Sequence, residues 1–542
     1  MVQIRRPNKL LCKNARNYFK EYCNNSSIHG FKYFGENRSY FERIWWFVVF
    51  VITLCIALYS IMQVYQKWIK SPVIVTFSTM ETPIYTIPFP SVTICPESKT
   101  AQYLYSHQKV VNDFFFNRNV SDEDLENLRY MGLICERDLA IEYPDNEFIT
   151  DEIYSKLDSL SPSMPMFYCQ FMGKDYPCDE LFTKVFTEEG LCYTFNTADN
   201  SDIYRENVYF HSLSKVNHSK LEWSLEEGYS KDAGLKTYPR RALLSDITNS
   251  LIVNVLFTHL DLDKTCKKGN QGLKVALHTA TRIPRMAHEY FRVPLDEVVI
   301  AGVTPNMIRT NSRLEYYDVS QRHCYFSYEK HLKYFKIYTP KNCRMECVAN
   351  YTLYYCGCVP FYMPRENSTN ICGLGSFDCA QFAEQSFQSR SLRNDLGETL
   401  ESLDNKDWPH EGEFFAGDLP DCECLPLCSD LTYNVETSQS KWNWLESFPK
   451  RNSSAVLMKM LAARRSKLIL YMKPSDFIFS ERNELYGPLD FLANFGGLLG
   501  LFTGFSMLSV MEALYFFTLR MFCNVRIYGH WSGKDHYSFS KD

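Results

Sequence analysis

Two long apolar segments, one towards each end of the chain, stand out from the pattern of hydrophobic and polar positions. The first, Ile44 to Met62, contains no charged residue and would form a helix of about 28 Å, the thickness of a bilayer core. It is too long for a signal peptide and lacks a small-residue cleavage site after it. The second, Phe491 to Leu519, has Glu512 as its only charge. The pattern predicts two membrane-spanning helices (residues 44–62 and 491–519) with one large domain, residues 63–490, between them.

Within residues 63–490, short-range patterns predict a mixture of strands and helices. Residues 71–95 combine β-branched residues with prolines, and "GLKVALHTA" and "EVVIAGVTP" are typical of strands. Ser121 and the acids after it predict a helix in "SDEDLENLRYMGL". A capping serine and helix-forming residues predict another helix from Ser454 to Leu470. We therefore expect an α+β membrane protein whose large β-containing domain carries helical subdomains.

The distribution of cysteines assigns the parts of the chain to different compartments. Of 20 cysteines, 16 lie between Cys95 and Cys428, whereas Cys12, Cys23, Cys55 and Cys523 lie in or outside the apolar segments. Disulfides persist outside the cell, so the middle of the chain is expected to be extracellular and disulfide-rich. A net charge of −5 without charged blocks gives no indication of a nucleic-acid partner.

Charge next to the spans predicts their orientation. Nine Lys or Arg and three Glu precede Ile44, so the arm 1–43 should be cytoplasmic. Two spans return the tail, residues 520–542, to the cytoplasm. Five glycosylation sequons fall in the external part: Asn119, Asn217, Asn350, Asn367 and Asn452.

Nine cysteines crowd between Cys343 and Cys428. A zinc site is one interpretation, but histidine is scarce, no C-x2-C pair recurs and the region is extracellular, so we expect disulfides and no metal. Paired bridges between facing segments would form a ladder that stiffens this region by restricting its unfolded states.

Five motifs, in order along the chain, resemble the degenerin and epithelial sodium channel family of amiloride-sensitive trimeric cation channels. They are "SSIHGFKYF" with its His29–Gly30 pair, "FPSVTIC" (Phe89–Cys95), "GLCYTFN" (Gly190–Asn196), "YTPKNCRMEC", and the Gly-x-Ser at Gly504. The "QRHCYF" run and the overall length are similar to the insect pickpocket branch.

The resemblance implies a set of disulfides. They are Cys95–Cys192, Cys169–Cys178, Cys324–Cys428, Cys343–Cys424, Cys347–Cys422, Cys356–Cys379 and Cys358–Cys372. Cys135 and Cys266 have no counterpart in the acid-sensing pattern, and by parity we expect them to bridge each other.

The second span is poorly suited to an unbroken lipid-facing helix. Gly496, Gly500 and Gly504 stack at four-residue intervals, which permits close packing of helices. Asn494 and Glu512 share one helix face, but Leu498, Leu501, Phe505 and Leu508 lie on that face between them. A break at Gly504-Phe505-Ser506 would turn backbone carbonyls towards a water-filled pore, where open backbone is tolerated, and would let Glu512 face water.

By resemblance, Gly504, Phe505 and Ser506 form the selectivity filter, His29, Gly30 and Ala493 take part in gating, and Asn494, Gly500 and Glu512 line the pore. Phe505 replaces the small residue often found in the filter. The resemblance implies a plasma-membrane sodium channel, sensitive to amiloride, independent of voltage and opened by a chemical, osmotic or mechanical stimulus outside the cell. It also implies three copies, alike or mixed with sister subunits, and no cofactor besides the permeant Na⁺.

Three other classes compete with this interpretation. A scavenger-type two-span receptor needs neither a glycine break nor an acid in the second span. An ATP-gated channel needs clustered external lysines and a different cysteine spacing. No phosphate loop, H-E-x-x-H or nucleophile motif indicates an enzyme.

Overall fold

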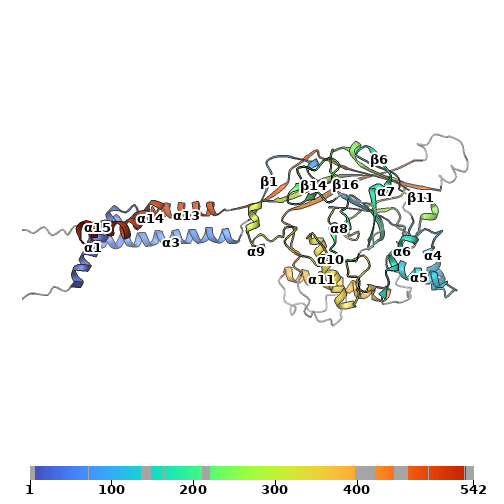
Figure 1. Cartoon of the computed structure of the whole chain (residues 1–542), viewed down its shortest axis with the longest axis horizontal. Coiled ribbons are helices and arrows are strands. Elements are labelled where there is room, and N and C mark those ends of the chain that lie inside the picture. Colours follow the sequence, from blue (N-terminus) through green and yellow to red (C-terminus); the bar gives the residue numbers. More distant parts are fainter. Residues whose placement is uncertain are drawn as a thin grey trace, which may run out of the picture. The chain divides into compact units, whose positions relative to one another are not determined.

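The computed structural model describes residues 7–70, 73–135, 148–162, 166–209, 220–396, 422–444, 462–485, 487–529 and 531–532. The chain forms two compact units. A helical unit contains Met1–Ile74, Asn311–Arg322 and Asn483–Asp542, and a sheet unit contains Val75–Thr310 and His323–Arg482. Figure 1 shows the helices of the first unit and the strands of the second.

The helical unit is built from both ends of the chain. Its elements are α1 (Pro7–Asn25), α2 (Lys32–Gly35), α3 (Tyr40–Lys70), η4 (Ser312–Tyr316), α9 (Val319–Arg322), α13 (Pro488–Thr503), α14 (Met507–Leu514), a π-helical turn η7 (Tyr515–Leu519) and α15 (Arg520–Tyr528). The first apolar helix, α3, extends past both ends of the predicted span. It runs beside α13 (Figure 1), and Trp68 stacks on Phe491 with ring centroids 5.0 Å apart.

An eight-stranded sheet organises the sheet unit, in the order β1-β19-β14-β17-β11-β5-β6, with β16 also paired to β14. The strands are β1 (Val73–Phe77), β5 (Met166–Phe171), β6 (Lys174–Tyr176), β11 (Leu251–Phe257), β14 (Glu297–Thr310), β16 (Asp430–Lys441), β17 (Arg464–Met472) and β19 (Ser480–Glu484). The long strand β14 is central because it pairs antiparallel with β16 on one side and parallel with β17 and then β19 on the other.

A second sheet of five strands has the order β13-β12-β3-β8-β7. Its strands are β3 (Ser91–Pro96), β7 (Phe182–Thr187), β8 (Gly190–Phe195), β12 (Leu273–His278) and β13 (Phe291–Val293). Short strands make up the rest: β2 (Thr82–Pro83), β4 (Phe148–Ile149), β9 (Trp223–Ser224), β10 (Gly228–Tyr229), β15 (Ile371–Cys372) and β18 (Asp476–Phe477). One apolar core joins the two sheets, with Phe195 and Phe257 almost fully buried in it.

Helices cover the edges of this unit: α4 (His107–Phe115), α5 (Asp122–Met131), α6 (Glu152–Leu160), α7 (Cys178–Leu181), α8 (Asn200–Ile203), α10 (Pro340–Cys356) and α11 (Phe377–Leu396), with short 3-10 turns η1 (Ile84–Thr86), η2 (Ile247–Asn249), η3 (His259–Asp261) and η5 (Leu374–Ser376). Ser121 caps α5 by accepting the Asp124 amide, as its sequence predicts. Thr339 caps α10 in the same way, Pro340 opens it, and Gly357 ends it in the left-handed conformation.

The helix predicted from Ser454 to Leu470 is wrong over its described part. Residues 445–461 lie outside the described residues, but Arg464–Met472 form β17, which pairs with β11 and β14. Leu468, Leu470 and Met472 are almost fully buried at alternate positions. Pairing on both edges satisfies the backbone and buries these side chains, which outweighs their intrinsic helix propensity.

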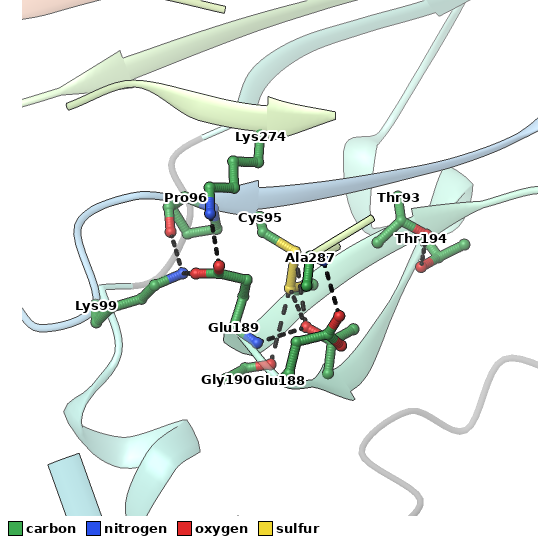
Figure 2. Close-up of a disulfide and its surroundings, with 12 residues drawn as sticks. Thr93, Cys95, Pro96, Lys99, Glu188, Glu189, Gly190, Thr194, Lys274 and Ala287 are labelled. Atoms are coloured by element: carbon green, nitrogen blue, oxygen red, sulfur yellow. Dashed lines mark hydrogen bonds and ion pairs between the residues drawn. A yellow bond between two sulfur atoms is a disulfide. The ribbon is translucent and has the colours of Figure 1, made fainter. Parts of the chain in front are cut away.

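A buried cluster of charges ties the five-stranded sheet together beside the Cys95–Cys192 disulfide (Figure 2). The Glu189 carboxylate lies 3.1 Å from Nζ of Lys99, 2.9 Å from Nζ of Lys267 and 2.6 Å from Nζ of Lys274. Burial by itself opposes ionisation of Glu189, but the three ammonium groups outweigh it and hold the pKa of Glu189 well below its usual range. The cluster links β12 and the segments that follow β3 and β7.

We expect Glu189→Gln to lower the free energy of unfolding by about 3–5 kcal/mol, because it leaves three buried ammonium groups without their anion. The folded-state pKa of Glu189 lies below its ordinary 4.5, so its stabilisation is present at neutral pH and is lost as the pH falls below that value. Thermal unfolding of the purified full-length protein in detergent, at pH 7.5 and at a series of pH values below 4.5, measures both effects. Glu123→Gln, at an exposed carboxylate of α5, is the control, and equal stability of the two variants at pH 7.5 would contradict the prediction.

Candidate ion pathway and gating elements

The second apolar segment breaks at the tripeptide predicted from the sequence. Helix α13 ends at Thr503, Gly504 adopts a left-handed backbone with φ of 67°, and α14 begins after Ser506. Gly504 donates its amide to Gly500 O at 2.9 Å, which closes α13. The Ser506 hydroxyl accepts from the Ser509 amide at 3.3 Å, which caps α14. Gly504, Phe505 and Ser506 therefore lie outside any helix.

The His29–Gly30 pair lies against this break. The His29 amide donates to Thr503 O at 2.9 Å, and the His29 ring occupies the place where a side chain at Gly504 would begin. Gly30, in turn, has φ of 86°, a conformation that favours glycine. Two motifs separated by most of the sequence, one predicted to act in gating and the other in ion selectivity, thus contact one another inside the helical unit.

Ser27, two residues before His29 in the same N-terminal segment, makes a second contact. Oε2 of Glu512 accepts hydrogen bonds from the Ser27 amide at 3.0 Å and the Ser27 hydroxyl at 2.9 Å. The Ser27 and Ser509 hydroxyls lie 2.7 Å apart. Within this chain, Glu512 is half-buried and has hydrogen-bond donors from Ser27, and its predicted position facing water in the pore stays a prediction. The serine in "SSIHG" was missed, although an acid within an apolar helix needs donors and a nearby hydroxyl supplies one.

An aromatic cluster lies further along the second apolar segment, at the π-helical turn. Tyr18 donates its hydroxyl to Phe516 O at 2.5 Å, and the Tyr22 and Phe516 rings are 5.3 Å apart. Arg520 forms an ion pair with Glu21. The Cys23 thiol is fully buried in this cluster, and burial raises its pKa to about 11. Helix α1 therefore holds the end of the second apolar segment through three of its residues, Tyr18, Glu21 and Tyr22.

The other predicted pore residues lie on α13. Ala493 and Asn494 are exposed in the single chain, and Asn494 donates its side-chain amide to Asp490 O at 2.9 Å. A side chain added at Gly496 would meet no atom within 4 Å, and one at Gly500 would meet only Phe505 O, at 3.8 Å. Close helix packing at Gly496 is thus absent among the described residues of one chain, and α3 packs on α13 through Trp68 and Phe491.

The described residues form eight disulfides, with the same partners as the sequence analysis expected, Cys135–Cys266 included. The ladder joins α10 and the segment before it to residues 422–428, at Cys324–Cys428, Cys343–Cys424 and Cys347–Cys422. All bridged cysteines belong to the sheet unit, and the free cysteines Cys23, Cys55 and Cys523 belong to the helical unit.

The predicted glycosylation sites differ in their surroundings. Asn119 and Asn367 are exposed, and Asn350 is half-buried on α10. Asn217 and Asn452 lie outside the described residues. Among the described residues, no group of three or more His, Cys, Asp or Glu side chains is placed to hold a metal ion.

Two helices of the described chain are long and apolar enough to cross a membrane, Tyr40–Lys70 and Met507–Tyr528. The second is counted only from Met507 because the break separates it from α13, which has 16 residues. The apolar helical segments therefore run from Pro488 to Tyr528, with the break inside them.

Comparison with known proteins identifies the family. The family described as "Amiloride-sensitive sodium channel" matches residues 22–516, so the chain belongs to it. Pickpocket protein 28 of Drosophila melanogaster is 28% identical over 525 residues, which covers 93% of this chain and 79% of the relative. Acid-sensing ion channel 1C of Danio rerio is 23% identical, covering 91% and 81%, and the bile acid-sensitive ion channel of Homo sapiens is 22% identical, covering 91% and 84%.

These findings place the protein in its class. It is a sodium channel subunit of the plasma membrane with two spans, and it is not an enzyme. The expected likeness to the insect pickpocket proteins is confirmed. Family membership also removes the receptor, ATP-gated channel and ectoenzyme alternatives.

Gly504→Ala should reduce sodium current about tenfold or more in cells where the wild-type chain conducts. An L-residue in the left-handed region costs roughly 1–2 kcal/mol, and the added carbon would displace His29. Whole-cell current, normalised to surface protein, measures the effect. Gly497→Ala is the matched control, because nothing lies within 4 Å of that position. Equal losses in the two variants would count against a special role for Gly504.

The Ser27–Glu512 contact should appear as coupling in a double-mutant cycle. Ser27→Ala and Glu512→Gln, measured by thermal unfolding of the purified channel, should be non-additive by roughly 0.5–3 kcal/mol because both remove the same hydrogen bond. Ser26→Ala is the matched control. The Ser26 hydroxyl accepts from the Ile28 amide, so Ser26→Ala should be additive with Glu512→Gln. Additivity of the Ser27 pair would show that the contact does not hold in the purified protein.

Proposed function

We propose that the chain is one subunit of a trimeric, sodium-selective, amiloride-sensitive and voltage-independent channel that opens in response to a stimulus on its extracellular domain. The observation that carries this proposal is the break at Gly504-Phe505-Ser506 with His29 placed against it. Broken backbone between two apolar helices is tolerated only where protein or water satisfies it. A pore-lining filter meets that condition.

The roles of single residues follow from this arrangement. Carbonyls of Gly504 and Phe505, freed from helical hydrogen bonding, would replace the hydration shell of a passing Na⁺. His29 and Gly30 would set the position of the filter from the cytoplasmic side. Asn494, Gly500 and Glu512 would line the path above and below it, and Ala493 would lie where neighbouring copies close the pore.

One chain supplies one broken helix, which cannot enclose a pore, so several copies must surround a common axis. The exposed faces of α13 and α14, including Leu501 and Leu508, are available for contact with such copies. We propose three, identical or mixed with sister subunits of the same family. The stimulus would be chemical, osmotic or mechanical.

The proposed orientation places both termini in the cytoplasm. The arm before the first span is rich in Lys and Arg, which favours retention on the cytoplasmic side. The separation of bridged from free cysteines between the two units supports the same orientation, because disulfides persist outside the cell and thiols inside it.

Voltage clamp of cells that express the chain, alone and with sister subunits, tests the proposal. We expect Ala493→Val to give a constitutive inward sodium current, blocked by amiloride and linear with voltage, because bulk at the closing position favours the open pore. Gly497→Ala, one turn further along α13, should add no such leak. Surface-expressed Ala493→Val without added current, where wild type conducts, would contradict the gating role, and no sodium current in any combination would contradict the proposed function.

A further inference from the structure

The sheet unit contains a cavity of about 720 Å³ beside the β9–β10 hairpin. Its walls come from residues 221–225 and 227–231, from Thr281 after β12, and from Ser327 and Ile337 ahead of α10. Cavities of roughly 300–1,000 Å³ are typical of small-molecule sites. No part of the ion pathway described above uses this cavity, which lies wholly in the sheet unit.

Hydrogen bonds hold the hairpin against the opposite wall. The Glu226 carboxylate accepts from the Ser327 amide at 3.1 Å and from the Ser327 hydroxyl at 3.0 Å. Within the hairpin, Tyr229 pairs with Trp223 in antiparallel register. The Tyr229 hydroxyl donates to Pro239 O at 2.8 Å, and the Arg241 guanidinium lies 3.7 Å from the centre of the Tyr229 ring. The walls are therefore preformed.

The lining combines apolar side chains with carboxylates. Leu221, Trp223, Leu225, Tyr229 and Ile337 supply the apolar surface. Trp223 is only 6% exposed, and its indole Nε1 is buried without a hydrogen-bond acceptor among the described residues.

The charges at the cavity favour a cation. Glu222 and Glu227 are exposed there, and within the described chain neither carboxylate has an ion-pair partner. Glu226 is engaged with Ser327, and Lys231 is the one basic residue among the lining positions. A bound anion would meet two carboxylates, whereas an ammonium group could pair with either of them.

We propose that this cavity is a binding site for a small organic ammonium compound with an apolar body. The ammonium lies between Glu222 and Glu227, and the body packs on Trp223, Leu225 and Ile337. An apolar body gains by leaving water, and the carboxylates discriminate against neutral and anionic molecules of the same shape. The site thus selects by charge as well as by size.

The walls of the cavity are connected to the disulfide ladder. Ser327 is three residues from Cys324, which is bonded to Cys428. Arg282, next to Thr281, forms an ion pair with Asp430 at the start of β16. An occupant that shifts these walls would act on the beginning of β16, and this step rests on the proposed function.

Binding to the purified full-length channel in detergent, measured by isothermal titration calorimetry at pH 7.4, tests the site without any measurement of current. The probes are 2-phenylethylamine, which is protonated at this pH, and its neutral counterpart 2-phenylethanol. We expect the amine to bind about tenfold or more tightly than the alcohol. The double variant Glu222→Gln/Glu227→Gln should remove that difference, and Ser230→Trp, which fills the cavity, should abolish binding of both probes. Glu123→Gln is the charge-matched control and should bind as wild type does.

Several results would overturn the proposal. They are equal affinity for the two probes, no binding of the amine, or preference for the amine that survives the double variant. The exposed glutamates tolerate glutamine without loss of fold, which unfolding of each variant verifies. Since calorimetry does not depend on conduction, absence of binding with normal sodium current overturns this site alone. Binding without current in any subunit combination would instead contradict the proposed function.

Discussion

Backbone groups that lie outside a helix between two apolar helices need hydrogen-bond partners, and the helical unit is organised around that need. Gly504 ends α13 and Ser506 starts α14, so carbonyls near the end of α13 lose their helical donors. The amide of His29 satisfies Thr503 O, and the Ser506 hydroxyl satisfies an amide of the next helix. Without the N-terminal segment, the break would leave Thr503 O without this donor. The hydrogen bond from His29 therefore satisfies part of the backbone at the break.

The same N-terminal segment also contacts the second apolar segment beyond the break. Ser27 contacts Glu512, and Tyr18 contacts the π-helical turn at Phe516. A π-helical turn leaves its backbone irregularly paired and is often found at functional sites. The donor from Tyr18 and the ion pair between Glu21 and Arg520 hold the turn from the side of α1. The break and the end of the second apolar segment are thus both held by residues that precede the first span in sequence.

Much of this arrangement could be predicted from the sequence, because the relevant signals lie in short stretches of residues or in motifs of recognisable order. The glycine followed by a capping serine predicts the break at Gly504, and the motif order leads to the disulfide partners. The strand at Arg464–Met472 could not be predicted, because its neighbours β11 and β14 are distant in sequence and decide its conformation. Ser27 was missed for a related reason. Its partner Glu512 is almost the whole chain away, and no local pattern signals such a pair.

The covalent order of the chain connects the sheet unit directly to the two apolar segments. The first span continues into β1, and β19 continues into α13. β1 pairs with β19, β19 with β14, and β14 with β16, which begins two residues after Cys428 of the ladder. A strand cannot slide against its neighbour by one residue without exchanging the faces of all its side chains, so displacement at β16 is not absorbed by slippage. In the proposed channel, such a displacement would pass across hydrogen-bonded strands to β1 and β19, the two strands that adjoin the spans in sequence. The disulfides restrict separation of α10 from residues 422–428, so in the proposed channel the ladder would move as one body.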